Sequence, residues 1–110
     1  MNLLHSGKVC FPHICLGSGI SGTYSNGLLA MEVMEEKYPD QEIYLVDSTL
    51  ASVGYGMLAI KAAELRDQGK TPQQCVDWME THKIEINTYY TTDNLEYLYK
   101  SGRVSRAGAV

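Results

Sequence analysis

A glycine- and serine-rich loop between an apolar run and an amphipathic helix constrains the fold of this chain most strongly. The apolar run covers residues 9–16 without alternation of polar and apolar side chains, as is typical of a parallel strand buried on both faces. The loop, LGSGISGTYSNG, occupies residues 16–27, and a helix is expected from about Ser21 to Tyr38. A strand that leads through such a loop into a helix is the repeating unit of α/β sheets.

The remainder of the chain continues this alternation. The predicted strands cover residues 9–16, 43–46 and 84–91, and the predicted helices cover residues 21–38, 51–68, 71–82 and 93–101. We therefore predict an α/β fold with a mostly parallel sheet flanked by helices in a Rossmann-like layered arrangement. A chain of 110 residues is sufficient for a single domain, residues 1–110.

Capping residues indicate where several helices begin and end. Thr71 and Gln74 have the spacing of a capping box, and so do Asp93 and Glu96. Gly69 is expected to end the preceding helix.

Composition excludes several classes of function. The net charge is −4 and no basic cluster is present, which argues against a nucleic-acid partner. No apolar run is long enough to span a membrane. Cys10, Cys15 and Cys75 are odd in number and lack the spacing of metal ligands, so we expect free thiols, a cytoplasmic location and no metal site. No Ser/His/Asp or Cys/His set occurs at a recognisable spacing, so no catalytic residue is predicted.

The loop from Gly17 to Gly22 is the first candidate site. A glycine-rich turn that opens a helix exposes backbone N–H groups at the positive end of the helix dipole, where an anion is favoured. Ser18 and Ser21 add hydroxyl donors, so a carboxylate or a phosphate suits the loop. A purely structural interpretation stays open, in which Ser21 caps the helix and the glycines form the turn.

The same loop spells G-x-G-x-x-G, so a dinucleotide-binding oxidoreductase fragment is the alternative function. Asp47 follows Gly22 by 25 residues, roughly where an acidic residue would bind a ribose hydroxyl. Two features count against this alternative: a helix end precedes the first strand, and the loop has more hydroxyls than a pyrophosphate needs.

Arg103 is the second candidate. It follows the helix-ending Gly102 on a loop, where its guanidinium can reach a carboxylate or a phosphate. A solvated surface arginine is the competing interpretation.

Three segments, HICLGSGISGTYSN, IYLVDSTLASVGYGMLAIKAAELRDQGKT and TTDNLEYLYKSGRVSRAGA, together resemble the DegV family in order and spacing. This resemblance extends over nearly the whole chain. It implies a bacterial fatty-acid-binding protein without catalytic residues or cofactor, which presents the carboxylate of a long-chain fatty acid to a separate fatty acid kinase subunit for acyl-phosphate formation.

The resemblance also implies roles for individual residues. Ser18, beside Gly19, corresponds to the serine that binds the carboxylate, Ser21 is the second choice, and Arg103 is carried over as a head-group or kinase-facing residue. The family usually has Ser-Ser-Gly where this chain has Gly17-Ser18-Gly19. The first of these glycines completes the G-x-G-x-x-G pattern, so the resemblance implies that the match to the dinucleotide motif is accidental. The uncharged residues 50–60 then form either a tunnel wall or ordinary core.

Finally, the resemblance implies that the chain is a fragment of a longer two-domain protein. Both ends look cut: residues 3–7 are typical of a helix end, and residues 106–110 of an opening turn. An upstream threonine and a histidine of the second domain, which complete the family's carboxylate site, are absent. We therefore expect weak binding by the chain alone, or self-association.

Overall fold

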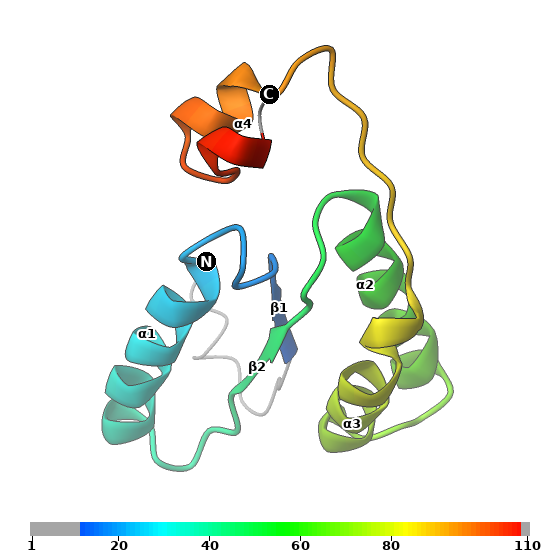
Figure 1. The fold of residues 1–110 in the computed structure, drawn as a ribbon. Coiled ribbons are helices and arrows are strands. Elements are labelled where there is room, and N and C mark those ends of the chain that lie inside the picture. Colours follow the sequence, from blue (N-terminus) through cyan, green and yellow to red (C-terminus); the bar gives the residue numbers. More distant parts are fainter. Residues whose placement is uncertain (1–11, 109–110) are drawn as a thin grey trace.

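A computed structural model describes residues 12–108 and contains one parallel sheet of two strands (Figure 1). Strand β1, Pro12–Cys15, pairs with β2, Tyr44–Asp47, with Pro12 opposite Tyr44 and Cys15 opposite Asp47. The parallel pairing predicted from the sequence is confirmed, and residues 9–11 of the first predicted strand lie outside the described residues. The loops that follow the two strands therefore start at the same edge of the sheet.

Helices lie on both faces of this sheet (Figure 1). Helix α1, Thr23–Lys37, packs on β2, while α2, Val53–Asp67, and α3, Pro72–His82, pack on the other side. Helix α1 comes close because residue 27 is a glycine: a Cβ atom there would lie 2.9 Å from Cδ2 of Leu45. The predicted α/β layering is confirmed.

The hydrophobic core lies between the sheet, α2 and α3. Its buried cluster consists of Val46, Leu50, Leu58 and Met79. Burial of side chains of this size contributes on the order of 1.5–3 kcal/mol each. No residue of α1 is fully buried, so the core is one-sided within the described residues.

The ends of α2 and α3 follow the predicted signals. Thr71 and Gln74 form a reciprocal capping box at the start of α3. Helix α2 ends at Asp67 with Gln68 as its C-cap, and the next residue, Gly69, has a φ of +82°, the left-handed conformation that glycine adopts without strain. The N–H of Gly69 donates to the carbonyl of Arg66 and that of Lys70 to Leu65, which is the Schellman arrangement.

The predicted third strand is wrong. Residues Lys83–Glu85 form a 3-10 turn, and the chain that follows runs extended along α2 without joining the sheet. Thr88 packs on Gly54, and the Tyr90 hydroxyl donates to the carbonyl of Ala51 at 2.9 Å. The alternating pattern predicted an extended backbone correctly, but a strand also needs a neighbour with which to form a ladder.

The last helix starts later than predicted, so the second capping box is also wrong. Helix α4, Glu96–Lys100, has no side-chain cap from Asp93; instead, Oδ1 of Asn94 accepts the N–H of Glu96 at 3.0 Å. Its end is as expected: Gly102 has a φ of +73°, and the N–H of Arg103 donates to the carbonyl of Leu98. This turn fixes the direction in which Arg103 leaves the helix.

Candidate functional site

The serine loop, residues 17–22, is held against the loop that follows β2. The N–H of Gly17 donates to the carbonyl of Leu50 at 2.8 Å. A Cβ atom on residue 17 would lie 2.7 Å from the carbonyl carbon of Thr49, a separation that side chains do not tolerate. Gly17 therefore allows two backbones to approach at the edge of the sheet.

The second loop, residues 48–52, has an unusual backbone. Thr49 and Ser52 have φ values of 59° and 50°, which are uncommon for residues other than glycine. The fully buried Ser48 stabilises the turn, because its hydroxyl accepts from the N–H of Leu50 and donates to the carbonyl of the same residue. Strained backbone of this kind persists only where the surroundings determine it, and it is frequent at binding sites.

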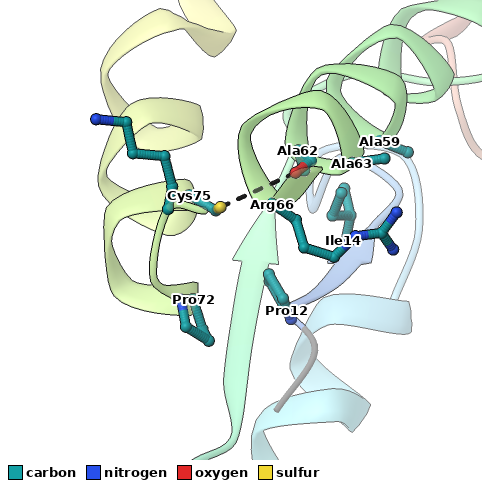
Figure 2. Close-up of a pocket in the computed structure, with 9 residues that line it drawn as sticks. Pro12, Ile14, Ala59, Ala62, Ala63, Arg66, Pro72 and Cys75 are labelled. Carbon is teal, nitrogen blue, oxygen red and sulfur yellow. Dashed lines mark hydrogen bonds between the residues drawn. The ribbon is translucent and has the colours of Figure 1, made fainter. Parts of the chain in front are cut away.

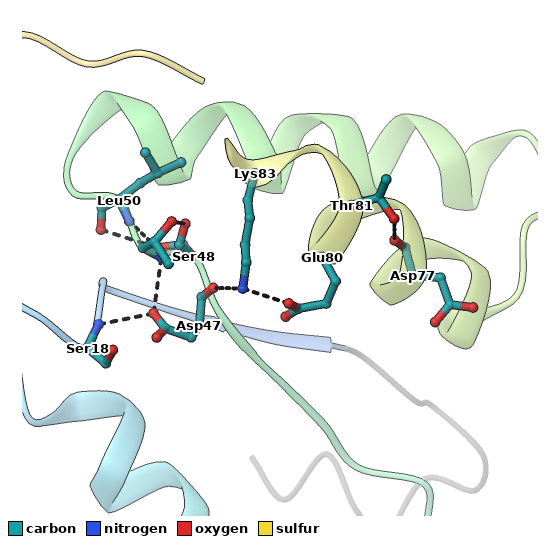
Figure 3. A network of polar contacts seen from close by, with 9 residues as sticks. Ser18, Asp47, Ser48, Leu50, Asp77, Glu80, Thr81 and Lys83 are labelled. Atoms are coloured by element: carbon teal, nitrogen blue, oxygen red, sulfur yellow. Dashed lines mark hydrogen bonds and ion pairs between the residues drawn. The ribbon is translucent and has the colours of Figure 1, made fainter. Parts of the chain in front are cut away.

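Asp47 joins the two loops (Figure 3). Its Oδ1 accepts the N–H of Ser18 and the N–H of Thr49, both at 3.0 Å. Burial raises the pKa of Asp47, but hydrogen bonds from Ser18 and Thr49 and the charge of Lys83 outweigh burial, so the pKa lies below its usual value. Asp47 is thus a carboxylate at neutral pH.

Lys83 supports Asp47 from the end of α3 (Figure 3). Its Nζ donates to the main-chain carbonyl of Asp47 at 2.8 Å and pairs with the Glu80 carboxylate at 2.6 Å. The pKa of the Cys15 thiol on β1 is raised mainly by burial and next by the charge of Asp47. The polar edge of the sheet is therefore a connected network that includes residues from β2, α3 and the serine loop.

The structure brings the predicted site residues together. Ser18, Gly19, Ser21 and Arg103 line one open depression of about 390 Å³ at the start of α1. Nε of Arg103 donates to the carbonyl of Ile20 at 3.3 Å, although the two residues are 83 positions apart in the sequence. Within residues 12–108 no carboxylate pairs with Arg103, so its charge faces a polar hollow.

The two serines differ in what their hydroxyls contact. The Ser21 hydroxyl bonds to the Thr23 hydroxyl at 2.7 Å and accepts the N–H of Thr23 at 3.2 Å. The structural interpretation left open for Ser21, that it caps the helix, is not supported, because the N-cap is Gly22 and α1 has no side-chain cap. The Ser18 hydroxyl lies close enough to Asp47 to help lower its pKa, so its single O–H donates either to that carboxylate or to a ligand.

The geometry does not favour the dinucleotide alternative. The third glycine of that fingerprint serves close packing of helix on strand, yet a Cβ on Gly22 would meet only the Asn26 side chain, at 4.0 Å. Gly27 makes that close approach instead. Asp47, the expected ribose ligand, is engaged by Ser18 and Thr49.

A second pocket lies near the amino ends of the strands (Figure 2). Its volume is about 250 Å³, and its walls are mostly apolar side chains of β1, α2 and α3, with Arg66 beside them. Arg66 pairs with Asp67 at 2.8 Å, so its charge is partly satisfied. This pocket is remote from the serine loop and adds nothing to an anion site there.

The described part of the chain contains neither a metal centre nor a membrane span. Residues 12–108 contain no group of three or more His, Cys, Asp or Glu side chains placed to hold a metal ion. None of the helices in that range is both long and apolar enough to cross a membrane.

Sequence reasoning missed the central role of Asp47 and the contribution of Lys83. The motif Asp47-Ser48-Thr49 after a strand was the available signal for Asp47, but it was interpreted as a ribose ligand. No signal in the sequence pointed to Lys83, since it reaches the main chain of a residue 36 positions away.

These features define an α/β fold with a polar loop site at the carboxyl edge of a parallel sheet. The family model described as "Uncharacterised protein, DegV family" matches residues 6–110. The chain belongs to the DegV family.

Relatives agree with this assignment and are longer than the chain. A DegV domain-containing protein of Clostridium perfringens is 37% identical over 97 residues, 88% of this chain and 33% of the relative. A DegV domain-containing protein of Streptococcus pyogenes is 38% identical over 97 residues, which are 88% of this chain and 34% of the relative. The chain thus spans about a third of the length of the curated relatives it matches.

Solved structures show the same fold. A DegV family protein of Ruminococcus gnavus, refined with vaccenic acid, matches with a TM-score of 0.80 and 30% identity, covering 86% of this chain and 34% of that one. A DegV family protein of Eubacterium eligens, loaded with heptadecanoic acid, also matches with a TM-score of 0.80. Its identity is 18%, and the match covers 94% of this chain and 38% of that one.

Proposed function

We propose that this chain provides the carboxylate-binding part of a long-chain fatty-acid site and binds lipid without catalysing a reaction. The observation that carries the proposal is the meeting of Ser18 and Arg103 in one polar depression. A hydroxyl donor and a guanidinium are the groups that a carboxylate head requires. Two solved structures with this fold contain fatty acids, heptadecanoic acid and vaccenic acid.

The apolar surface of α2 supports the acyl-chain half of the proposal. Gly54 and Leu58 face the core, but Val53, Met57 and Ile60 are 74%, 52% and 64% exposed. Their spacing places them along one side of the helix. The uncharged start of α2 therefore serves as core on one side and is free to contact an acyl chain on the other.

The proposal extends to the partners of the longer protein. We propose that Arg103 and the serine loop present the fatty-acid carboxylate to a separate kinase subunit, which forms the acyl phosphate, and that no cofactor takes part. Arg103 lines the depression and is exposed, so a partner can reach it. Cys15 and Cys75 are free and buried, which fits a reducing cytoplasm.

The experiment is native mass spectrometry of the purified chain, followed by extraction and lipid analysis. A stoichiometric long-chain acid, in the monomer or in a self-associated form, would support the proposal. A protein that stays empty after incubation with heptadecanoic acid would refute binding by this chain, and a bound nucleotide would favour the oxidoreductase alternative.

Two variants assign the residues. Ser18→Ala should weaken binding of heptadecanoic acid by about 1–3 kcal/mol, the cost of losing a hydrogen bond to a charged group. Arg103→Ala should impair phosphorylation of the bound acid by a fatty acid kinase more than it affects stability, since this loop arginine is exposed. Unchanged affinity in the first variant, or a loss of stability with normal turnover in the second, would remove the residue from the site.

A further inference from the structure

Asp47 is a charged residue at the site that the proposed function does not use. It lies beside the serine loop, and its negative charge opposes an anion in the depression. A carboxylate at such a position needs another reason to be there, and its contacts provide one. A single oxygen, Oδ1, accepts N–H groups from both loops at the carboxyl edge of the sheet.

We propose that Asp47 is a positioning residue, which fixes the serine loop so that the Ser18 hydroxyl and Arg103 converge on the anion. The inference rests on the proposed function for the identity of the anion. By accepting the N–H of Ser18, Asp47 also turns that donor away from the depression. The anion is then held by side chains and not by the backbone cradle that a dinucleotide loop uses.

The surroundings of Asp47 make this arrangement rigid. Gly17 brings the two loops into contact, and a hydrogen bond of 2.8 Å to Leu50 holds them there. Lys83 fixes the main chain of Asp47 from the side of α3, and its own charge is balanced by Glu80. The thiol of Cys15, at the end of the adjacent strand, is a further titratable neighbour.

Two substitutions separate the position of the acceptor from the charge. Asp47→Asn keeps an oxygen at the same place and removes the charge, whereas Asp47→Glu keeps the charge and displaces the oxygen by one methylene. Asp67→Asn, at an exposed aspartate paired with Arg66, controls for the change in net charge. The readout is the ratio of affinities for heptadecanoic acid and its methyl ester, measured by competition against a fluorescent fatty acid.

If Asp47 acts by position, Asp47→Asn should keep the acid-to-ester ratio at or above the wild-type value, because a repulsive charge has gone. Asp47→Glu should lower the ratio about tenfold, as expected when one charge-assisted hydrogen bond is misaligned. A general loss of stability would weaken acid and ester alike and leave the ratio unchanged. The opposite pattern, with Asn damaging and Glu harmless, would overturn the proposal.

A second measurement needs no ligand. In ¹H–¹⁵N spectra, the amide resonances of Ser18 and Thr49 should move together as acid protonates Asp47, and Asp47→Asn should abolish the movement. Resonances that titrate independently would overturn the shared acceptor. Should the wild-type chain bind neither acid nor ester, the proposed function fails, while this titration still decides whether Asp47 holds the loop.

Discussion

Substitution of Gly17 by alanine tests the contact on which the whole site depends. The new Cβ would lie 2.7 Å from the carbonyl carbon of Thr49 and 3.0 Å from the nitrogen of Leu50. Both are backbone atoms, so neither can rotate away as a side chain would. The loops must separate, and the hydrogen bond from Gly17 to Leu50 lengthens with them.

The expected cost follows from two terms. Forcing a methyl group into closely packed surroundings costs about 1–3 kcal/mol. Loss of the hydrogen bond adds about 1 kcal/mol. We therefore expect Gly17→Ala to lower the free energy of unfolding by about 2–4 kcal/mol, which is a large fraction of the 5–15 kcal/mol typical of a domain.

Gly19→Ala is the matched control, because it makes the same chemical change in the same loop. No heavy atom lies within 4 Å of a Cβ at that position. Its effect should stay within about 0.5 kcal/mol, as for other exposed substitutions. Urea denaturation followed by circular dichroism compares the two variants at equal protein concentration.

Equal midpoints for Gly17→Ala and Gly19→Ala would refute the close approach of the two loops. The pair also separates the two interpretations of the loop. In a dinucleotide site the second glycine of the fingerprint lets the backbone approach the pyrophosphate, so Gly19 would be the sensitive position for binding. In this structure we expect Gly17 to be the sensitive position, and its substitution should lower the stability of the fold.

Three further outcomes follow from the contacts. The pKa of Asp47 in the folded protein lies below its usual value of 3.8, so its charge stabilises the fold above about pH 4. This stabilisation is lost as the pH falls through the folded pKa. The urea midpoints of wild type and Asp47→Asn should therefore converge at that pH. Burial and the charge of Asp47 raise the pKa of the Cys15 thiol above 9.0. In a Cys10→Ser variant, mass spectrometry should therefore find Cys15 unmodified by iodoacetamide at about pH 8 until urea is added. Prompt modification would contradict its burial. Thr71→Ala should cost about 1 kcal/mol by removing the cap of α3, whereas Thr81→Ala, within the same helix, should cost less than half of that in the same denaturation assay.

The sequence was sufficient where the physical cause is local. The capping box at Thr71 and the left-handed turn at Gly69 depend on neighbouring residues alone, and both occur as predicted. The parallel pairing of the first two strands was also predictable, because apolar runs without alternation need cover on both faces. Family resemblance pointed to Ser18 and Arg103, and the structure places them in one depression.

The predicted third strand is wrong because a distant partner decides its outcome. Residues 84–91 have the alternation of a strand, but Ile84 and Tyr89 are 79% and 95% exposed and no neighbouring strand is present among the described residues. The capping box at Asp93 fails for a local reason: α4 starts at Glu96, and the N–H of that residue donates to the side chain of Asn94 instead. A local pattern specifies what a segment is able to form, and packing determines what it does form.

For the glycines of the serine loop, too, packing and not the local motif determines the role of each residue. The spelling G-x-G-x-x-G assigns each glycine a task, but the structure distributes these tasks differently. Gly17 faces a second loop, Gly19 faces open space, and close packing of α1 on the sheet belongs to Gly27. Asp47 then takes the N–H of Ser18 that a pyrophosphate would need. What remains for a ligand is a hydroxyl and a guanidinium, and that combination suits a carboxylate better than a dinucleotide.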